Sequence, residues 1–107
     1  MYQQQGDVLI KRIDRLPNGD KVKVPCVQGR LVLAEGEATG HAHEISGQDI
    51  EQVEMFRVNG ELFLDVKGHV VVRHEEHKDQ EVSPGIYRVD VVREVDPFTE
   101  EVRRIRD

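Results

Sequence analysis

The stretch IEQVEMFRVNGELFLDV (residues 50–66) contains two partly apolar segments on either side of Asn59-Gly60. The Asn-Gly pair favours the positive φ angles of a type I′ turn, the two-residue turn that best joins antiparallel strands. After the turn every second residue is apolar, at Leu62, Leu64 and Val66. Alternate residues of a strand share one face, so the stretch predicts a β-hairpin with a buried face.

Similar segments occur along the rest of the chain and are separated by turn residues roughly every eight to twelve positions. They are DVLIKRI (7–13), KVKVP (21–25), GRLVLAEGE (29–37), HVVVRH (69–74) and GIYRVDVVREV (85–95). This spacing predicts an all-β fold, a small β-barrel or β-sandwich, with residues 1–107 as a single domain. We expect KVKVP to be half-buried, with Pro25 ending its strand or marking a sheet edge.

The last segment, DPFTEEVRRIRD (96–107), fits two structures. Asp96-Pro97 is either a hairpin turn before a further strand or the N-cap and first position of a short helix over 97–106. We favour the hairpin because the rest of the chain has β character.

Composition excludes several classes of protein. The chain has 107 residues with 15 Lys and Arg against 21 Asp and Glu, a net charge of −6, and lacks the basic face of a general nucleic-acid binder. No apolar run reaches the length of a membrane span, and the N-terminus has no signal-peptide pattern, so we expect a cytoplasmic protein. Its one cysteine, Cys26, is expected to be a small, buried or half-buried residue.

A pair of histidines, His41 and His43, is the first candidate for chemistry. Residues two apart in a strand project from the same face, and Ile45 continues that face. Isoleucine favours the interior, so we expect both imidazoles to point inward. Two imidazoles so placed can bind one metal ion at about 2.0–2.1 Å.

A second pair, His74 and His77, stands in HEEH at the end of HVVVRH. Positions three apart in a strand face opposite ways, so these imidazoles converge only if Glu75 to His77 turns or bulges. Asp79 and Gln80 favour such a turn. We therefore predict a metal site with ligands His41, His43, His74 and His77, and with Gln48 and Glu75 as additional oxygen ligands.

Imidazole ligands suit divalent transition metals, and Zn, Ni, Fe and Mn are all candidates. No organic cofactor is implied. An open coordination position would allow catalysis by a metal-activated water, whereas four filled positions would make the site structural. The sequence therefore leaves enzymatic activity, catalytic residues and any small-molecule substrate open.

Two other interpretations of the histidines stay open. Without metal they could pair with Glu44, Glu75 or Glu76 in acid–base chemistry, or have only structural roles. A different hypothesis makes the chain an interaction module. If HVVVRH lay at a sheet edge it would recruit another strand, most simply in a homodimer.

Part of the chain resembles the cupin family. Gly36, His41-Ala42-His43 and Gln48 follow the first cupin motif, in which a glycine precedes H-x-H and an acid follows. Gln48 stands where that motif has glutamate. The turn in residues 83–87 resembles the second motif, with Tyr87 where the motif has histidine. The resemblance implies a small cupin-like barrel.

The chain as a whole resembles a group of small, uncharacterised bacterial and phage-associated proteins. The resemblance spans nearly all 107 residues. It rests on GDVL (6–9), LAEGEATGHAHEI (33–45), HEEH (74–77), PGIYRV (84–89) and REVDP (93–97). It implies a self-contained domain and carries no established activity.

Overall fold

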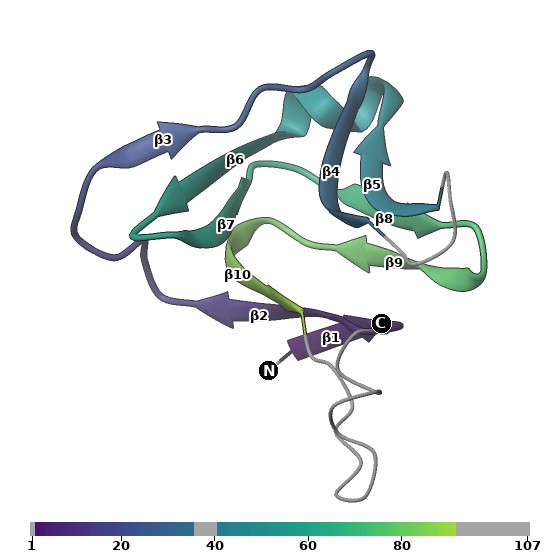
Figure 1. Cartoon of the computed structure of the whole chain (residues 1–107), viewed down its shortest axis with the longest axis horizontal. Helices are drawn as coiled ribbons and strands as arrows, with labels where there is room; N and C mark the ends of the chain where they lie inside the picture. The colour runs from purple at the N-terminus through teal and green to yellow at the C-terminus, as the bar shows by residue number, and fades with distance from the viewer. Residues whose placement is uncertain (1, 36–40, 92–107) are drawn as a thin grey trace, which may run out of the picture.

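A computed structural model of the chain describes residues 2–35 and 41–91, and within these ranges ten strands form two antiparallel sheets (Figure 1). The all-β prediction is confirmed. Of the two predicted architectures, the two-sheet arrangement is the observed one, because the described strands do not close into a barrel. The predicted C-terminal hairpin or helix, over 97–106, lies outside the described residues.

The larger sheet has six strands in the order β1-β2-β10-β7-β6-β3. Their bounds are β1 Tyr2–Gln5, β2 Val8–Ile13, β3 Lys21–Lys23, β6 Val53–Val58, β7 Glu61–Val66 and β10 Gly85–Val91. The predicted hairpin joins β6 to β7. Asn59 and Gly60 have φ angles of 54° and 81°, the positive values that a type I′ turn requires.

The smaller sheet has four strands in the order β4-β5-β8-β9. Their bounds are β4 Arg30–Glu35, β5 Ala42–Ser46, β8 Val70–His74 and β9 His77–Val82. A short 3₁₀-helix, η1 (Gly47–Gln52), connects β5 to β6 and takes in Ile50, which the sequence had suggested as the start of a strand.

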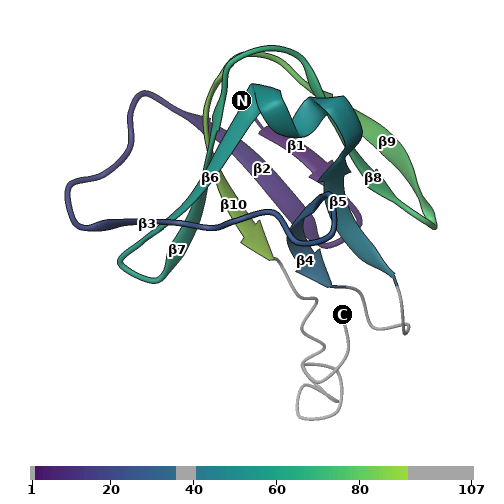
Figure 2. The ribbon, with the colours of Figure 1, turned by 90° about the horizontal axis from the view of Figure 1, so that it is seen from above.

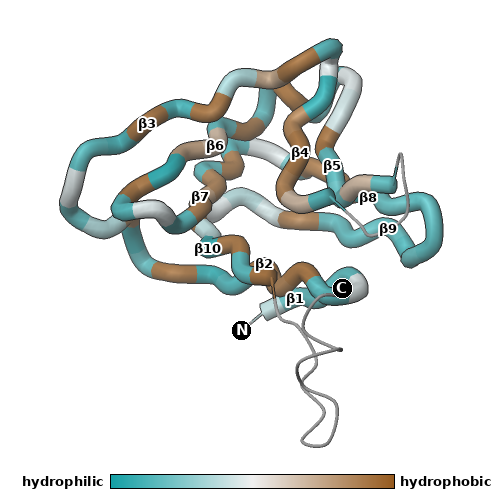
Figure 3. The backbone as a smooth tube through the Cα atoms, in the orientation of Figure 1, coloured by the Kyte–Doolittle hydropathy of each residue, from teal (hydrophilic) through white to brown (hydrophobic). Residues whose placement is uncertain are grey.

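Apolar side chains from both sheets form one core. The fully buried members, with exposed fractions of 0%, come from strands of each sheet: Val8, Ile10, Ile45, Leu64, Val70, Val72 and Val82. The apolar positions recur along β2, β4, β7 and β10 (Figure 3). Burying one face of each sheet against the other is what stabilises this fold.

The two sheets approach each other where β1 lies beside β9 (Figure 2). No strand pairing joins β1 to β9 there; glutamine side chains make the connection. Gln3 Nε2 donates to the backbone oxygen of Glu81 at 2.6 Å, and Gln5 Nε2 donates to the backbone oxygen of Lys78 at 2.8 Å. The junction brings the N-terminal strand to the strands that carry the histidines.

The strand HVVVRH, which the interaction hypothesis placed at a sheet edge, lies inside the smaller sheet. The strand of HVVVRH, β8, lies between β5 and β9, so its backbone is not the free edge that the interaction hypothesis needs. β3 is an edge strand as Pro25 suggested, but it is exposed and not half-buried, since Val22 is 62% exposed. Two polar strands, β1 and β9, were not predicted at all.

Cys26 is exposed, contrary to the expectation of a half-buried residue. It lies at a cleft of about 480 Å³ whose apolar lining includes Val24, Leu31, Ile50 and Met55. Within the described part of the chain no histidine lines this cleft, so it is separate from the histidine segments.

Among residues 2–35 and 41–91, no helix has the length and apolar character needed to cross a membrane.

Candidate metal centre

The two histidine segments lie side by side in the smaller sheet. β5 carries His43, and His41 directly precedes that strand, while β8 and β9 carry His74 and His77. β5 pairs with β8, with Glu44 opposite Arg73. Sheet pairing therefore places the four imidazoles at one end of the sheet, and we call them the histidine cluster.

The turn that the sequence required for convergence is present. β8 and β9 form a hairpin whose loop is Glu75 and Glu76, and His74 pairs directly with His77 across it. The register shifts between Val72 and His74, so a bulge accompanies the turn. Asp79 and Gln80, which the sequence suggested as turn residues, lie within β9, after the turn.

His74 occupies the middle of the histidine cluster. Its ring centroid is 4.3 Å from that of His43, 4.7 Å from that of His77 and 5.8 Å from that of His41. The ligating atoms nevertheless do not converge on one point. The group whose donor atoms all lie within 4.8 Å of one another is His41, His74 and Glu75, which we call the outer set.

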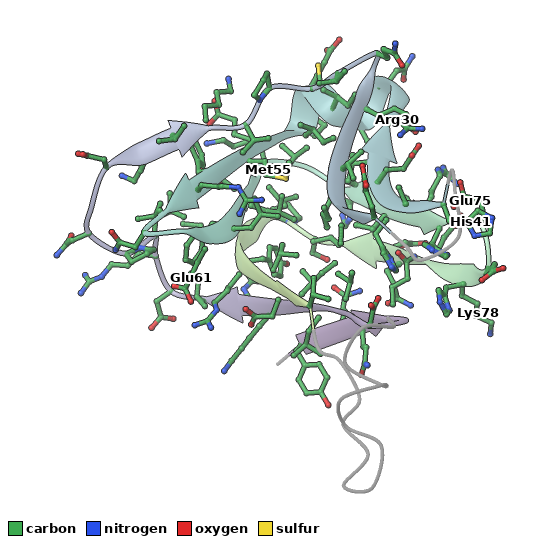
Figure 4. The ribbon with its side chains drawn as sticks, viewed as in Figure 1. Arg30, His41, Met55, Glu61, Glu75 and Lys78 are labelled. Carbon is green, nitrogen blue, oxygen red and sulfur yellow. The ribbon has the colours of Figure 1, made fainter. Side chains whose placement is uncertain are left out.

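Glu75 is held toward His41 by the backbone. The side chains of Glu75 and His41 lie next to each other (Figure 4). The N–H of Ala42 donates to Glu75 Oε1 at 3.1 Å. Hydrogen bonds from the backbone of Glu75 itself and of Ala42 lower the pKa of the Glu75 carboxyl group. Glu75 is therefore a carboxylate at neutral pH.

His74 already has a hydrogen-bond partner in the turn. The N–H of Glu76 donates to His74 Nδ1 at 3.0 Å, which places the proton of the neutral ring on Nε2. A metal ion at Nδ1 would have to displace this N–H, and one at Nε2 would require the proton to move. Metal binding therefore involves a local change in the Glu75–Glu76 turn, at a cost of about one hydrogen bond, roughly 0.5–1.5 kcal/mol.

His43 is the buried member, with 1% of its surface exposed. Its Nδ1 is 2.8 Å from Gln5 Oε1. Gln5 Nε2 donates to the backbone oxygens of Val72 and Lys78, both at 2.8 Å. Both amide hydrogens are thus used on carbonyls, so Gln5 Oε1 must accept and His43 Nδ1 must donate. Neutral His43 therefore has its lone pair on Nε2.

Asp7 faces that lone pair, with Oδ1 3.4 Å from His43 Nε2. Burial lowers the pKa of His43, and the neighbouring His74 and His77 lower it further, while Asp7 opposes the shift. Burial is the largest of these effects, so neutral His43 is the main form near neutral pH.

His77 packs against the turn between β1 and β2. A Cβ atom on Gly6 would lie 2.6 Å from His77 Nε2, so the absence of a side chain is what allows the ring to approach. Gly6 also has a φ of 59°, a left-handed conformation that favours glycine. The ring of His77 stacks on that of His43 at 6.0 Å.

Of the other acidic and amide candidates, Gln48 and Glu44 have positions or partners away from the histidine cluster, and Glu76 lies at its edge. Gln48 is exposed in η1, beyond the opposite end of β5 from His41. Glu44 pairs with Arg30 at 3.2 Å. Glu76 lies 3.7 Å from His41 Nδ1 and is 66% exposed, so it is a peripheral neighbour of the cluster.

Sequence reasoning missed Gln5 and Asp7, which both come from the β1–β2 hairpin. The segment QQQGD has no apolar alternation, so nothing in it indicates a strand. Its one signal is Gly6-Asp7, a pair suited to a turn. That signal would have located the hairpin but not its contact with the histidines.

One family model, described as "Domain of unknown function (DUF8820)", matches residues 4–92. The chain belongs to this family. The match includes the whole histidine cluster and the β1–β2 turn, so the candidate site lies within the DUF8820 domain. The prediction of membership in an uncharacterised family is confirmed, although the match does not address the cupin resemblance.

Searches for relatives of this DUF8820 domain among curated proteins and among solved structures found no match. The function of the domain therefore has to be argued from its own side chains.

We expect the metal-free DUF8820 domain to become less stable as the pH falls below about 6.5, the ordinary pKa of histidine. Burial holds the pKa of His43 lower in the folded state, so in this range the unfolded chain binds a proton that the folded chain does not. The free energy of unfolding should therefore decrease as the pH falls from about 6.5. Urea unfolding at about pH 7.5 and about pH 5.5 measures the effect.

The exposed His69 supplies the control for this measurement. The His69→Gln variant should keep the pH dependence, and His43→Asn should reduce it. Equal stability of the parent protein at the two pH values would contradict the assignment.

Proposed function

We propose that this domain binds a divalent transition metal ion through the outer set, His41, His74 and Glu75. The observation that carries the proposal is that one donor atom from each residue lies within 4.8 Å of the others. Ligands of a tetrahedral ion at about 2.0–2.1 Å are about 3.3 Å apart, so small side-chain movements bring these atoms to coordinating distance.

The chemistry of the outer set suits a site of this kind. Two imidazoles and a carboxylate are ligands that Zn, Ni, Fe and Mn accept. The Ala42 N–H orients the carboxylate of Glu75, as outer hydrogen bonds commonly do at metal sites. Burial is incomplete, with 27% of the His41 side chain exposed, so solvent can reach the ion.

A three-residue ligand set leaves a coordination position open. In metalloenzymes that position holds a water whose pKa the metal lowers, which makes it a nucleophile at neutral pH. If the domain is an enzyme, metal-assisted hydrolysis is the reaction class that fits this ligand set.

We expect Zn²⁺ to raise the unfolding temperature of the full chain, purified without a polyhistidine tag. Binding only to the folded state should raise it by about 10 °C when free Zn²⁺ is about 100 times its Kd. The His41→Ala and Glu75→Gln variants should show a smaller rise, because each removes a ligand. Thermal denaturation with metal analysis of the dialysed protein is the measurement.

His69→Ala is the matched control, since it removes an exposed histidine outside the cluster and should leave the rise unchanged. The proposal would be wrong if Zn²⁺, Ni²⁺, Fe²⁺ and Mn²⁺ all left the unfolding temperature unaltered. A rise that both cluster variants retained in full would also contradict it.

A cytoplasmic setting belongs to the same proposal. The exposed thiol of Cys26 fits a reducing compartment, where free cysteines persist. The bacterial or phage setting and the cupin-like character rest on the sequence resemblances alone.

A further inference from the structure

We propose that His43 and Asp7 form a second cation position, which we call the inner site, at the buried end of the histidine cluster. The outer set does not include either residue. The inner site is therefore an addition to the proposed function, and it depends on a different part of the chain, the β1–β2 turn.

The lone pair of His43 has a fixed direction. Gln5 uses both amide hydrogens on backbone oxygens of β8 and β9, so its oxygen faces His43 Nδ1 and keeps the proton there. Nε2 is then an acceptor inside a residue that is 1% exposed. A buried acceptor without a donor is unfavourable by roughly 1–3 kcal/mol, so such an atom needs a partner.

A carboxylate lies opposite Nε2. Asp7 Oδ1 is 3.4 Å from this atom. A carboxylate oxygen is also an acceptor, so two lone pairs face each other and repel unless a positive charge lies between them. Their separation matches the spacing of about 3.3 Å between two ligands of one tetrahedral ion.

A second imidazole lies beside His43 and the turn that carries Asp7. His77 stacks on His43 with their ring planes 12° apart, and its Nε2 lies against Gly6, the neighbour of Asp7 in the turn. His77 is exposed, and a rotation of its ring toward Asp7 would bring a second imidazole to the inner site. Two imidazoles and one carboxylate would then hold a divalent transition metal, with Asp7, at 20% exposure, on the path from solvent.

The test is a Zn²⁺ titration of the full chain, without a tag and without metal, measured by isothermal titration calorimetry. The absorption of bound Co²⁺ is a second readout. The parent protein should bind about two equivalents. Asp7→Asn should bind about one, because the amide keeps the shape of the carboxylate and loses its charge. Glu75→Gln should also bind about one, and Asp20→Asn, an exposed control outside both sites, should still bind about two.

Thermal unfolding of each metal-free variant checks that the fold is kept. The inner site is wrong if the parent binds only about one equivalent of Zn²⁺, and if Glu75→Gln loses this binding while Asp7→Asn keeps it. In that case a proton alone bridges His43 and Asp7. The proposal for the outer set would still stand after this result. The reverse pattern supports the inner site and overturns the outer set. No binding in the parent overturns both.

Discussion

Replacement of Gln5 by alanine is expected to lower the free energy of unfolding by about 3 kcal/mol or more. The side chain makes three hydrogen bonds, to the backbone oxygens of Val72 and Lys78 and to His43 Nδ1. Each partner left unsatisfied in the interior costs roughly 1–3 kcal/mol. This loss is large against a typical domain stability of about 5–15 kcal/mol.

The effect has a structural reason beyond the count of bonds. Gln5 is 2% exposed and connects β1 of the larger sheet to β5, β8 and β9 of the smaller one. Its loss therefore weakens the junction between the sheets and also frees the His43 ring from its fixed tautomer. Urea unfolding followed by circular dichroism measures the first consequence, and the nitrogen shifts of His43 in NMR report the second.

Gln4→Ala is the matched control, since Gln4 is the exposed neighbour in the same strand and bonds only locally, to Gly6 O at 2.9 Å. It should change stability by less than about 0.5 kcal/mol. Equal losses of unfolding free energy in the two variants would mean that strand β1 as a whole, and not the buried Gln5 amide, stabilises the domain.

Replacement of Gly6 by alanine is expected to destabilise the domain by about 1–2 kcal/mol and to displace His77. The stability loss comes from the φ of 59°, which side chains disfavour. The displacement comes from the new Cβ, which would lie 2.6 Å from His77 Nε2. Because His77 is exposed, its ring should move instead of the backbone, which keeps the added cost small.

Gly47→Ala separates the two effects. Gly47 has a similar φ of 68°, but among the described residues no atom beyond its two chain neighbours and the backbone of its own helix lies within 4 Å of the Cβ position. Both variants should therefore lose similar stability in urea unfolding, while only Gly6→Ala should shift the His77 ring resonances and weaken Zn²⁺ binding at the inner site. Unchanged His77 resonances in Gly6→Ala would contradict the close packing of this ring on the turn.

Strands with an apolar face could be predicted because their signal is local. The Asn59-Gly60 hairpin, Leu31 and Leu33 on β4, and Tyr87 on β10 are found as the alternation indicates. Val22 alternates equally well, but it lies in the edge strand β3 and is 62% exposed among the described residues. Alternation indicates a strand, but burial depends on what packs against it.

The polar strands β1 and β9 had no such signal. Five of the six side chains of β9 are exposed or only partly buried, and Val82 is the buried exception. What places β9 is its pairing with β8 through the Glu75–Glu76 turn. Neighbouring strands supply backbone hydrogen-bond partners regardless of the side-chain pattern, so the sequence does not predict such strands.

His41 lies just before β5 and is only partly buried, so the strand period does not extend to it. The sequence did predict that His43 and Ile45 share a face, because the two-residue period of a strand is a property of the backbone, and both are buried in β5. It also indicated that HEEH must turn for its histidines to meet. The grouping of these side chains could be seen only in the folded chain, where His41, His74 and Glu75 lie near one another and His43 lies against Asp7. That division depends on Gln5, 38 residues away from His43, whose amide sets the direction of one imidazole. Local periodicity fixes which way a side chain points from its strand, whereas its hydrogen-bond partner is set by packing between segments far apart in the chain.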